Sequence, residues 1–289
     1  MRQLATVRSC CLALVLVLAA GIAHAQPGVI ILRNIQYAAP GGVSLRLDAY
    51  LPPGAGPFPA VIAIHGGGWH SGSKAAWATE AVRLARAGFA TFSVDYRLAP
   101  TYRRPAQIED VQAAVTWLRA HAATYKVKPD RIGAIGSSAG AHLAQMLAMR
   151  GSGGTGTGSR VRAAVSWSGP SDMVELAQSD DPAIVSALTD LFGDLGNTAL
   201  ETDASPLHFL DPTDPPIYHA HSIEEFVPFD QAALLRTALT DEEIPQMETI
   251  LPGTRHARGY EGDVWLQSVD FLRLYLVGRP QIGPPTGDD

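Results

Sequence analysis

Short apolar segments that alternate with helical patterns constrain the fold of this 289-residue chain more than any other feature. Segments with the length and composition of strands occur at 44–51, 60–66, 90–97, 131–137, 163–169, 216–222 and 247–252. Between them, apolar residues recur at helical spacing, as in Ile108, Val111, Val115 and Leu118, and again in Trp265, Val269, Leu272 and Leu276. This repetition predicts an α/β fold, with a mostly parallel central sheet and helices on both faces.

The composition of the strands predicts their places in the sheet. Residues 44–51 alternate apolar and polar side chains, which is typical of a half-exposed antiparallel strand at the N-terminal edge. The middle segments are almost continuously apolar and should be covered on both faces. Residues 178–206 interrupt the alternation, and we expect them to form a small cap over the carboxyl edge of the sheet. The glycine-rich stretch 151–159 is predicted to be a surface loop, because the alternation resumes directly after it.

The first 25 residues have the layout of a secretory signal peptide. Arg2 and Arg8 precede a short apolar run, which ends in a small-x-small site before Gln26. The run is shorter than the roughly 20 residues that a membrane span needs. We therefore expect cleavage after Ala25, no stable membrane anchor after it, and a secreted or periplasmic location.

Charge and cysteine content narrow the range of partners. The formal net charge is −6, and no cluster of lysine or arginine stands out. A negative surface disfavours nucleic acid and polyanionic substrates. Cys10 and Cys11 both lie in the predicted signal peptide, so the mature chain is expected to rely on its core without a disulfide. The Pro/Gly-rich tail, 279–289, is predicted to be disordered.

Ser138 is the central residue of the sequence GSSAG, which occupies residues 136–140. The motif follows an apolar strand and opens a helical segment, which is the context of a nucleophile on a tight strand-to-helix turn. The backbone of such a serine is strained, and only small residues two places on either side avoid a clash. Ser137 lacks that clearance, because Ile135 and Ala139 flank it, so we expect it to point into the fold.

His142 is four residues from Ser138 on the same helix, and its side chain should lie alongside the turn. A general base must reach the serine hydroxyl from the open side of the turn, above the sheet edge. His142 is therefore predicted to be a packing or hydrogen-bonding residue.

A second motif, IHGGGWHSG at 64–72, follows the strand of residues 60–66. Its glycines leave backbone N–H groups accessible, and Gly67, Gly68 and Ala139 are the predicted donors to an oxyanion. Trp69, next to this loop, is a candidate apolar wall for substrate, with ordinary packing as the alternative. His65 and His70 have no further ligands at metal-binding spacing, so we predict no metal site and expect His65 to brace the loop.

These motifs together resemble the α/β-hydrolase esterases and lipases. HGGGW, then VDYRLAP at 94–100, then the run from Pro105 to Ala144 are most similar to hormone-sensitive-lipase-like enzymes and to bacterial feruloyl/acetylxylan esterase-like (BD-FAE) proteins. The resemblance extends from about Leu45 to about Leu276. It implies an α/β-hydrolase catalytic domain over residues 26–278, a catalytic order of serine, acid and histidine, and the oxyanion hole described above.

The acid is the point at which the chain departs from the pattern that the resemblance implies. The family pattern looks like H-G-x-x-D-x-x-V-P, whereas residues 221–228 read HSIEEFVP. Counting back from Val227 and Pro228 places the acid at Glu224, and counting forward from His221 places it at Glu225. We favour Glu224, because the Val-Pro pair precedes a matching helical segment. The extra methylene of glutamate, about 1.5 Å, would partly offset the shorter loop.

His256 is the predicted base, because it lies in a loop after the last strand and follows both the serine and the acid. Other histidines either precede the acid or lie in a helix, as His121, His208, His219 and His221 do. Asp95 and Asp110 belong to the motifs of the resemblance and are expected to be structural.

The function that follows is that of a secreted serine carboxylic-ester hydrolase, which acts through an acyl-enzyme and needs no metal or organic cofactor. The resemblance favours short-chain or acetyl/feruloyl-type esters, on small molecules or on polysaccharide. Two alternatives stay open. One is a binding protein of the same fold that has lost catalysis, because the acid has changed, and the other is a peptidase. The sequence does not predict an oligomeric state.

Overall fold

The computed structural model describes residues 28–154 and 157–278. The predicted signal peptide and the predicted disordered tail lie outside these residues. Within the described ranges, no helix is both long enough and apolar enough to span a bilayer.

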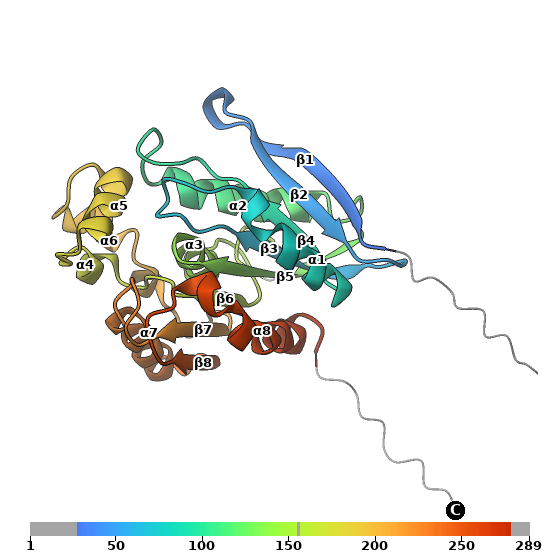
Figure 1. Ribbon diagram of the computed structural model, residues 1–289. Coiled ribbons are helices and arrows are strands. Elements are labelled where there is room, and N and C mark those ends of the chain that lie inside the picture. Colours follow the sequence, from blue (N-terminus) through green and yellow to red (C-terminus); the bar gives the residue numbers. More distant parts are fainter. Residues whose placement is uncertain (1–27, 155–156, 279–289) are drawn as a thin grey trace, which may run out of the picture.

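One sheet of eight strands forms the centre of the molecule (Figure 1). Its strands are β1 (Ile30–Ala38), β2 (Leu45–Leu51), β3 (Phe58–Ile64), β4 (Ala90–Val94), β5 (Val127–Ser137), β6 (Ala164–Trp167), β7 (Ile217–Ser222) and β8 (Gln246–Leu251). Their order in the sheet is β1-β2-β4-β3-β5-β6-β7-β8. The pairs β1·β2 and β2·β4 are antiparallel and all the others are parallel, which confirms the predicted α/β class.

Helices cover both faces of the sheet. They are α1 (Ala78–Arg86), α2 (Ala106–Ala120), α3 (Ala139–Met149), α4 (Met173–Leu176), α5 (Pro182–Phe192), α6 (Thr198–Thr202), α7 (Asp230–Asp241) and α8 (Glu261–Leu276). Short 3₁₀ turns are η1 (Pro40–Gly42), η2 (Lys74–Trp77), η3 (Pro206–Phe209) and η4 (Ala257–Tyr260). Strand β3 shows the two cores directly. Ile62 belongs to the core that includes residues of α2, α3 and α7 on one face, and Val61 belongs to the core that includes residues of α1 and α8 on the other.

The N-terminal edge differs from the sequence prediction. Residues 44–51, predicted to be the edge strand, form β2, which lies between β1 and β4. The edge is β1, whose first residues, including Ile30, Ile31 and Leu32, are exposed. Two register shifts interrupt its pairing with β2, between Leu32 and Ile35 and between Gln36 and Ala38. The alternating apolar and polar residues of 44–51 therefore belong to a strand that is paired on both sides, and not to the edge strand.

The segment predicted to be a cap contains α5 and α6. Helix α5 begins after Asp181, whose side chain accepts hydrogen bonds from the N–H groups of Ala183 and Ile184, with Pro182 in the first turn. Its apolar face, including Leu188 and Leu191, belongs to the larger core. The cap is thus anchored to the domain, and its outer residues are free to form the wall of a pocket.

Candidate active site

Ser138 lies on the turn between β5 and α3, in a backbone conformation of φ 55° and ψ −123°. A non-glycine residue rarely adopts this conformation, because its side chain crowds the backbone. The flanking glycines are required by contact: a Cβ on Gly136 would lie 2.1 Å from the carbonyl oxygen of Gly140, and one on Gly140 would lie 2.2 Å from that of Ile64. The local sequence therefore builds a tight turn that leaves Ser138 partly exposed, while Ser137 is buried.

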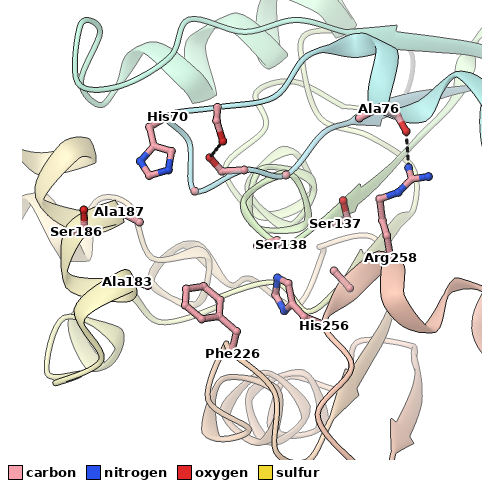
Figure 2. A pocket seen from close by; sticks show the side chains of 15 residues that line it. His70, Ala76, Ser137, Ser138, Ala183, Ser186, Ala187, Phe226, His256 and Arg258 are labelled. Carbon is pink, nitrogen blue, oxygen red and sulfur yellow. Dashed lines mark hydrogen bonds between the residues drawn. The ribbon is translucent and has the colours of Figure 1, made fainter.

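His256 occupies the loop between β8 and η4. Its Nδ1 hydrogen-bonds to Oε2 of Glu225, whose side chain is completely buried. With Nδ1–H donated to a carboxylate, Nε2 of the neutral imidazole is left as a proton acceptor. His256 and Ser138 line one open pocket of about 570 Å³ (Figure 2).

The carboxylate on His256 corrects the sequence prediction, which favoured Glu224. Glu224 is exposed, and its backbone N–H donates to the carbonyl of Gly253. Glu225 is held instead at the end of β7, where the N–H of Ser222 donates to its Oε1 at 2.9 Å. The acid therefore keeps the spacing from His221 that the family pattern gives. The loop is one residue shorter than that pattern, and the missing residue falls between Glu225 and Val227.

Further donors surround the buried carboxylate of Glu225. The hydroxyl of Ser168 donates to Oε1 at 2.8 Å, and Nε2 of His221 lies 3.3 Å from the same oxygen. Burial lowers the pKa of His221, so this imidazole is neutral, and its Nε2–H is directed mainly to the carbonyl of Val227 at 2.8 Å. A buried ionised carboxylate needs such partners, since an unpaired one is costly. The site meets that requirement.

Amide donors are present beside Ser138. Gly67 and Gly68 line the same pocket, and Ala139 directly follows the serine at the start of α3. In the part of the chain that the structure describes, none of these three N–H groups donates to a protein acceptor. Gly66 permits the close approach of this loop, because a Cβ there would meet the carbonyl oxygen of Ser137 at 2.7 Å. These three N–H groups are the candidates for binding an oxyanion.

The pocket between these groups is open to solvent. Its walls also contain His70, Ser71, Ala76, Ser137, Ala183, Ser186, Ala187, Phe226, Ala257 and Arg258, so α5 of the cap forms one side. Among the hydrogen bonds of the described residues, none joins Ser138 Oγ to His256. In ligand-free enzymes the contact between nucleophile and base is often long and tightens only when substrate binds.

Trp69 lies in the wall of a small apolar recess next to Ser138. It is buried, with a positive φ of 61°, and its indole N–H donates to Nδ1 of His142 at 3.2 Å. His142 Nε2 in turn lies 2.8 Å from the carbonyl oxygen of Ala204, and burial lowers the pKa of His142 to about 4. His142 therefore has the packing and hydrogen-bonding role expected of it. The recess, which Leu188 also lines, has a volume of about 20 Å³.

The remaining polar residues singled out in the sequence are structural. His65 stacks on Tyr96 and hydrogen-bonds to the carbonyl of Gly66 at 2.8 Å, which braces the glycine loop as expected. Asp95 accepts the N–H of Lys74, and Asp110 pairs with the guanidinium of Arg97. No group of three potential metal-ligating side chains occurs within residues 28–154 and 157–278.

Sequence reasoning did not find Ser168 or two further residues that line the pocket, Phe226 and Arg258. Ser168 directly follows β6, and the carboxyl ends of neighbouring parallel strands converge at one edge. A systematic look at polar residues that follow β5, β6 and β7 would have found it. Phe226 and Arg258 directly adjoin the acid and the base loop, but their orientation depends on the fold.

Comparison with known proteins identifies the family. Residues 47–239 match the sequence profile of the BD-FAE family. The chain belongs to the BD-FAE family. Curated relatives include the probable carboxylic ester hydrolase LipM of Mycobacterium tuberculosis, which is 30% identical over 70% of this chain and 50% of its own length. Esterase LipQ of the same organism is 29% identical over 76% of this chain and 56% of its own. The BD-FAE chain thus spans about half the length of these relatives.

Solved structures similar to this BD-FAE protein confirm the α/β-hydrolase fold. A truncated carbohydrate esterase from gut microbiota superposes with a TM-score of 0.76 at 25% identity, covering 88% of this chain and 98% of its own. An esterase of Thermogutta terrifontis has a TM-score of 0.72 at 22% identity, covering 90% of this chain and 96% of its own. The likeness therefore extends over almost the whole of each of those domains.

Proposed function

We propose that this BD-FAE protein is a serine carboxylic-ester hydrolase, with Ser138 as nucleophile, His256 as general base and Glu225 as the acid that orients the imidazole. The observation that carries the proposal is the buried Glu225 carboxylate on Nδ1 of His256, in the same pocket as a serine on a strained turn. This is the arrangement that acyl transfer through a covalent intermediate needs.

The reaction follows from the positions of these groups. Nε2 of His256 takes the proton of Ser138 as Oγ attacks the ester carbonyl, and the resulting oxyanion accepts from the N–H groups of Gly67, Gly68 and Ala139. His256 then gives its proton to the departing alcohol, which leaves the acyl group on Ser138. Water, deprotonated by the same imidazole, releases the acid and restores the serine. These steps use only the side chains and amides of the protein.

The shape of the site favours a short acyl group on a bulky alcohol. The recess beside Ser138 is apolar and has room for about one water-sized group, which suits the methyl of an acetyl ester better than a feruloyl group. The open pocket next to it leaves space for a large alcohol such as a sugar. The similarity to a carbohydrate esterase supports an acetylated carbohydrate as substrate. With the signal-peptide layout of residues 1–25, we place this activity outside the cytoplasm.

The test is hydrolysis of p-nitrophenyl esters from acetate to octanoate by the wild type and Ser138→Ala. We expect turnover that is highest for acetate and falls by at least about 10³-fold in the variant. If no ester is turned over in a Ser138-dependent way, the result favours a binding protein of the same fold. Turnover of peptide p-nitroanilides at rates that match the esters would instead favour a peptidase.

A further inference from the structure

A single hydroxyl, that of Ser168, touches every segment that carries the histidine–glutamate pair. It lies 2.8 Å from Oε1 of Glu225, accepts the N–H of Ala257 at 2.8 Å and lies 2.6 Å from the hydroxyl of Tyr260. Ala257 directly follows His256 in the chain. Ser168 therefore connects the end of β6 both to the acid and to the backbone of the base.

The protons of this network can be assigned from the acceptors. The N–H of Ala257 can only donate, so Ser168 Oγ is the acceptor in that contact. The carboxylate of Glu225, when ionised, can only accept, so Ser168 is the donor in that one. Ser168 thus gives its proton to Glu225, the charged and stronger acceptor. Tyr260 keeps its proton, since burial raises its pKa well above the ordinary value. The Tyr260 hydroxyl donates that proton to the carbonyl oxygen of Ala220 at 2.7 Å, because a carbonyl can only accept.

The backbone of Ser168 adopts a conformation that glycine tolerates, so the contribution of the side chain can be tested by replacing it with glycine. Its φ is 55°, a conformation that glycine adopts at lower cost than serine. The residue is also completely buried, so its hydroxyl needs partners inside the protein. Replacement by glycine would relax the backbone and remove the hydroxymethyl side chain, and with it every contact of the hydroxyl.

We propose that Ser168 is a positioning residue for catalysis, which holds Glu225 with Oε2 toward His256 and fixes the base loop through Ala257. This inference rests on the proposed function, because it assigns a task to a residue that touches the acid and not the substrate. One oxygen of the carboxylate is held by Ser168 and by the N–H of Ser222, so the other remains for the imidazole.

The decisive variant is Ser168→Gly, compared with Tyr260→Phe, which removes the neighbouring hydroxyl and leaves Ser168 in place. Both are assayed on p-nitrophenyl acetate, with active sites titrated by an organophosphate so that kcat is expressed per competent site. We expect Ser168→Gly to lower kcat by about 10- to 100-fold, the effect of a displaced catalytic group, with KM changed less than about 3-fold. Tyr260→Phe should lower kcat less than Ser168→Gly.

A double-mutant cycle separates positioning from general structural damage. If Ser168 acts through Glu225, then Ser168→Gly should cost less than about 3-fold in a Glu225→Gln background. Equal losses in both backgrounds, or wild-type kcat in Ser168→Gly, would overturn the inference. Ser138→Ala keeps the two proposals distinct. Activity that survives in Ser138→Ala removes the proposed function itself, whereas an inactive Ser138→Ala beside a fully active Ser168→Gly removes only the role of Ser168.

Discussion

The indole of Trp69 and the imidazole of His142 are joined by a hydrogen bond from Nε1 to Nδ1, with the two rings edge to face at 5.3 Å. The contact ties the glycine loop, which supplies the amide donors, to the helix that begins after Ser138. This one buried pair therefore fixes the position of the glycine loop relative to the helix that follows Ser138. Its acceptor is an imidazole that stays neutral, because burial lowers the pKa of His142 to about 4.

This pair predicts a pH-dependent stability. The pKa of a histidine is about 6.5 in an unfolded chain, so below that pH the unfolded state binds a proton that folded His142 does not. The free energy of unfolding should fall by up to about 1.4 kcal/mol per pH unit from about pH 6.5 down to about pH 4. We expect His142→Gln, which cannot titrate, to show a shallower decrease of Tm between pH 7.5 and 5. Equal slopes would mean that His142 does not contribute.

Glu225 and Glu224 make a matched pair for testing the acid. Glu225→Gln keeps the size of the side chain but cannot hold the imidazole in the productive tautomer as a carboxylate does, so kcat should fall by about 10³- to 10⁴-fold. Glu224→Gln changes an exposed side chain and should leave kcat within about 3-fold of wild type. Steady-state kinetics on p-nitrophenyl acetate compare the two. A greater loss in the second variant would reassign the acid.

The recess beside Ser138 predicts how acyl preference can be changed. Leu188 lines it from α5 and is fully buried, so Leu188→Ala would enlarge the space by three carbon atoms. We expect the ratio of kcat/KM for butyrate over acetate to rise by about 10-fold or more, because each accommodated methylene contributes about 1–3 kcal/mol. Leu234→Ala, at an exposed position on α7, is the control. An unchanged ratio in Leu188→Ala would place the acyl group elsewhere.

Arg258, two residues after the base, joins its loop to the opposite side of the pocket. Its guanidinium donates to the carbonyl of Ala76 at 2.6 Å and to the buried carboxylate of Glu80. Arg258→Met leaves that carboxylate without this partner and should lower the free energy of unfolding by about 1.5–3 kcal/mol. The measurement is urea denaturation. Arg273→Met, which breaks an exposed pair with Asp270, should change stability much less, and equal effects would contradict the assignment.

Much of the fold could be predicted because the hydrophobic pattern is strong where strands are buried. The segment 216–222 corresponds closely to β7, and 131–137 corresponds to the C-terminal part of β5, which begins earlier, at Val127. Strand β1 escaped prediction, since its residues are mostly exposed and its pairing is interrupted. A pattern that reports burial is weakest at a sheet edge, where only one neighbour and little of the core define the strand.

The residues of the site also differ in how far the sequence could locate them. Ser138 sits in a motif whose glycines are demanded by contacts of its own turn, so the local sequence is sufficient to locate it. The choice between Glu224 and Glu225 depends on which side chain meets the backbone N–H of Ser222 at the end of β7, and the two spacing counts disagree on it. Ser168 illustrates the same limit, because its contacts with Glu225 and Ala257 form only once the segments after β6, β7 and β8 lie together.

The exposed strand β1 has a consequence for how the protein behaves in concentrated solution. A strand that is paired on one side only, with exposed isoleucine and leucine at its start, could act as a template for another chain. The two interruptions of its ladder disrupt the regular spacing that such a template requires. The irregularity of this edge thus opposes growth of the sheet from one molecule to the next, and the exposed Arg33 within β1 adds a charge of the kind that often guards such edges.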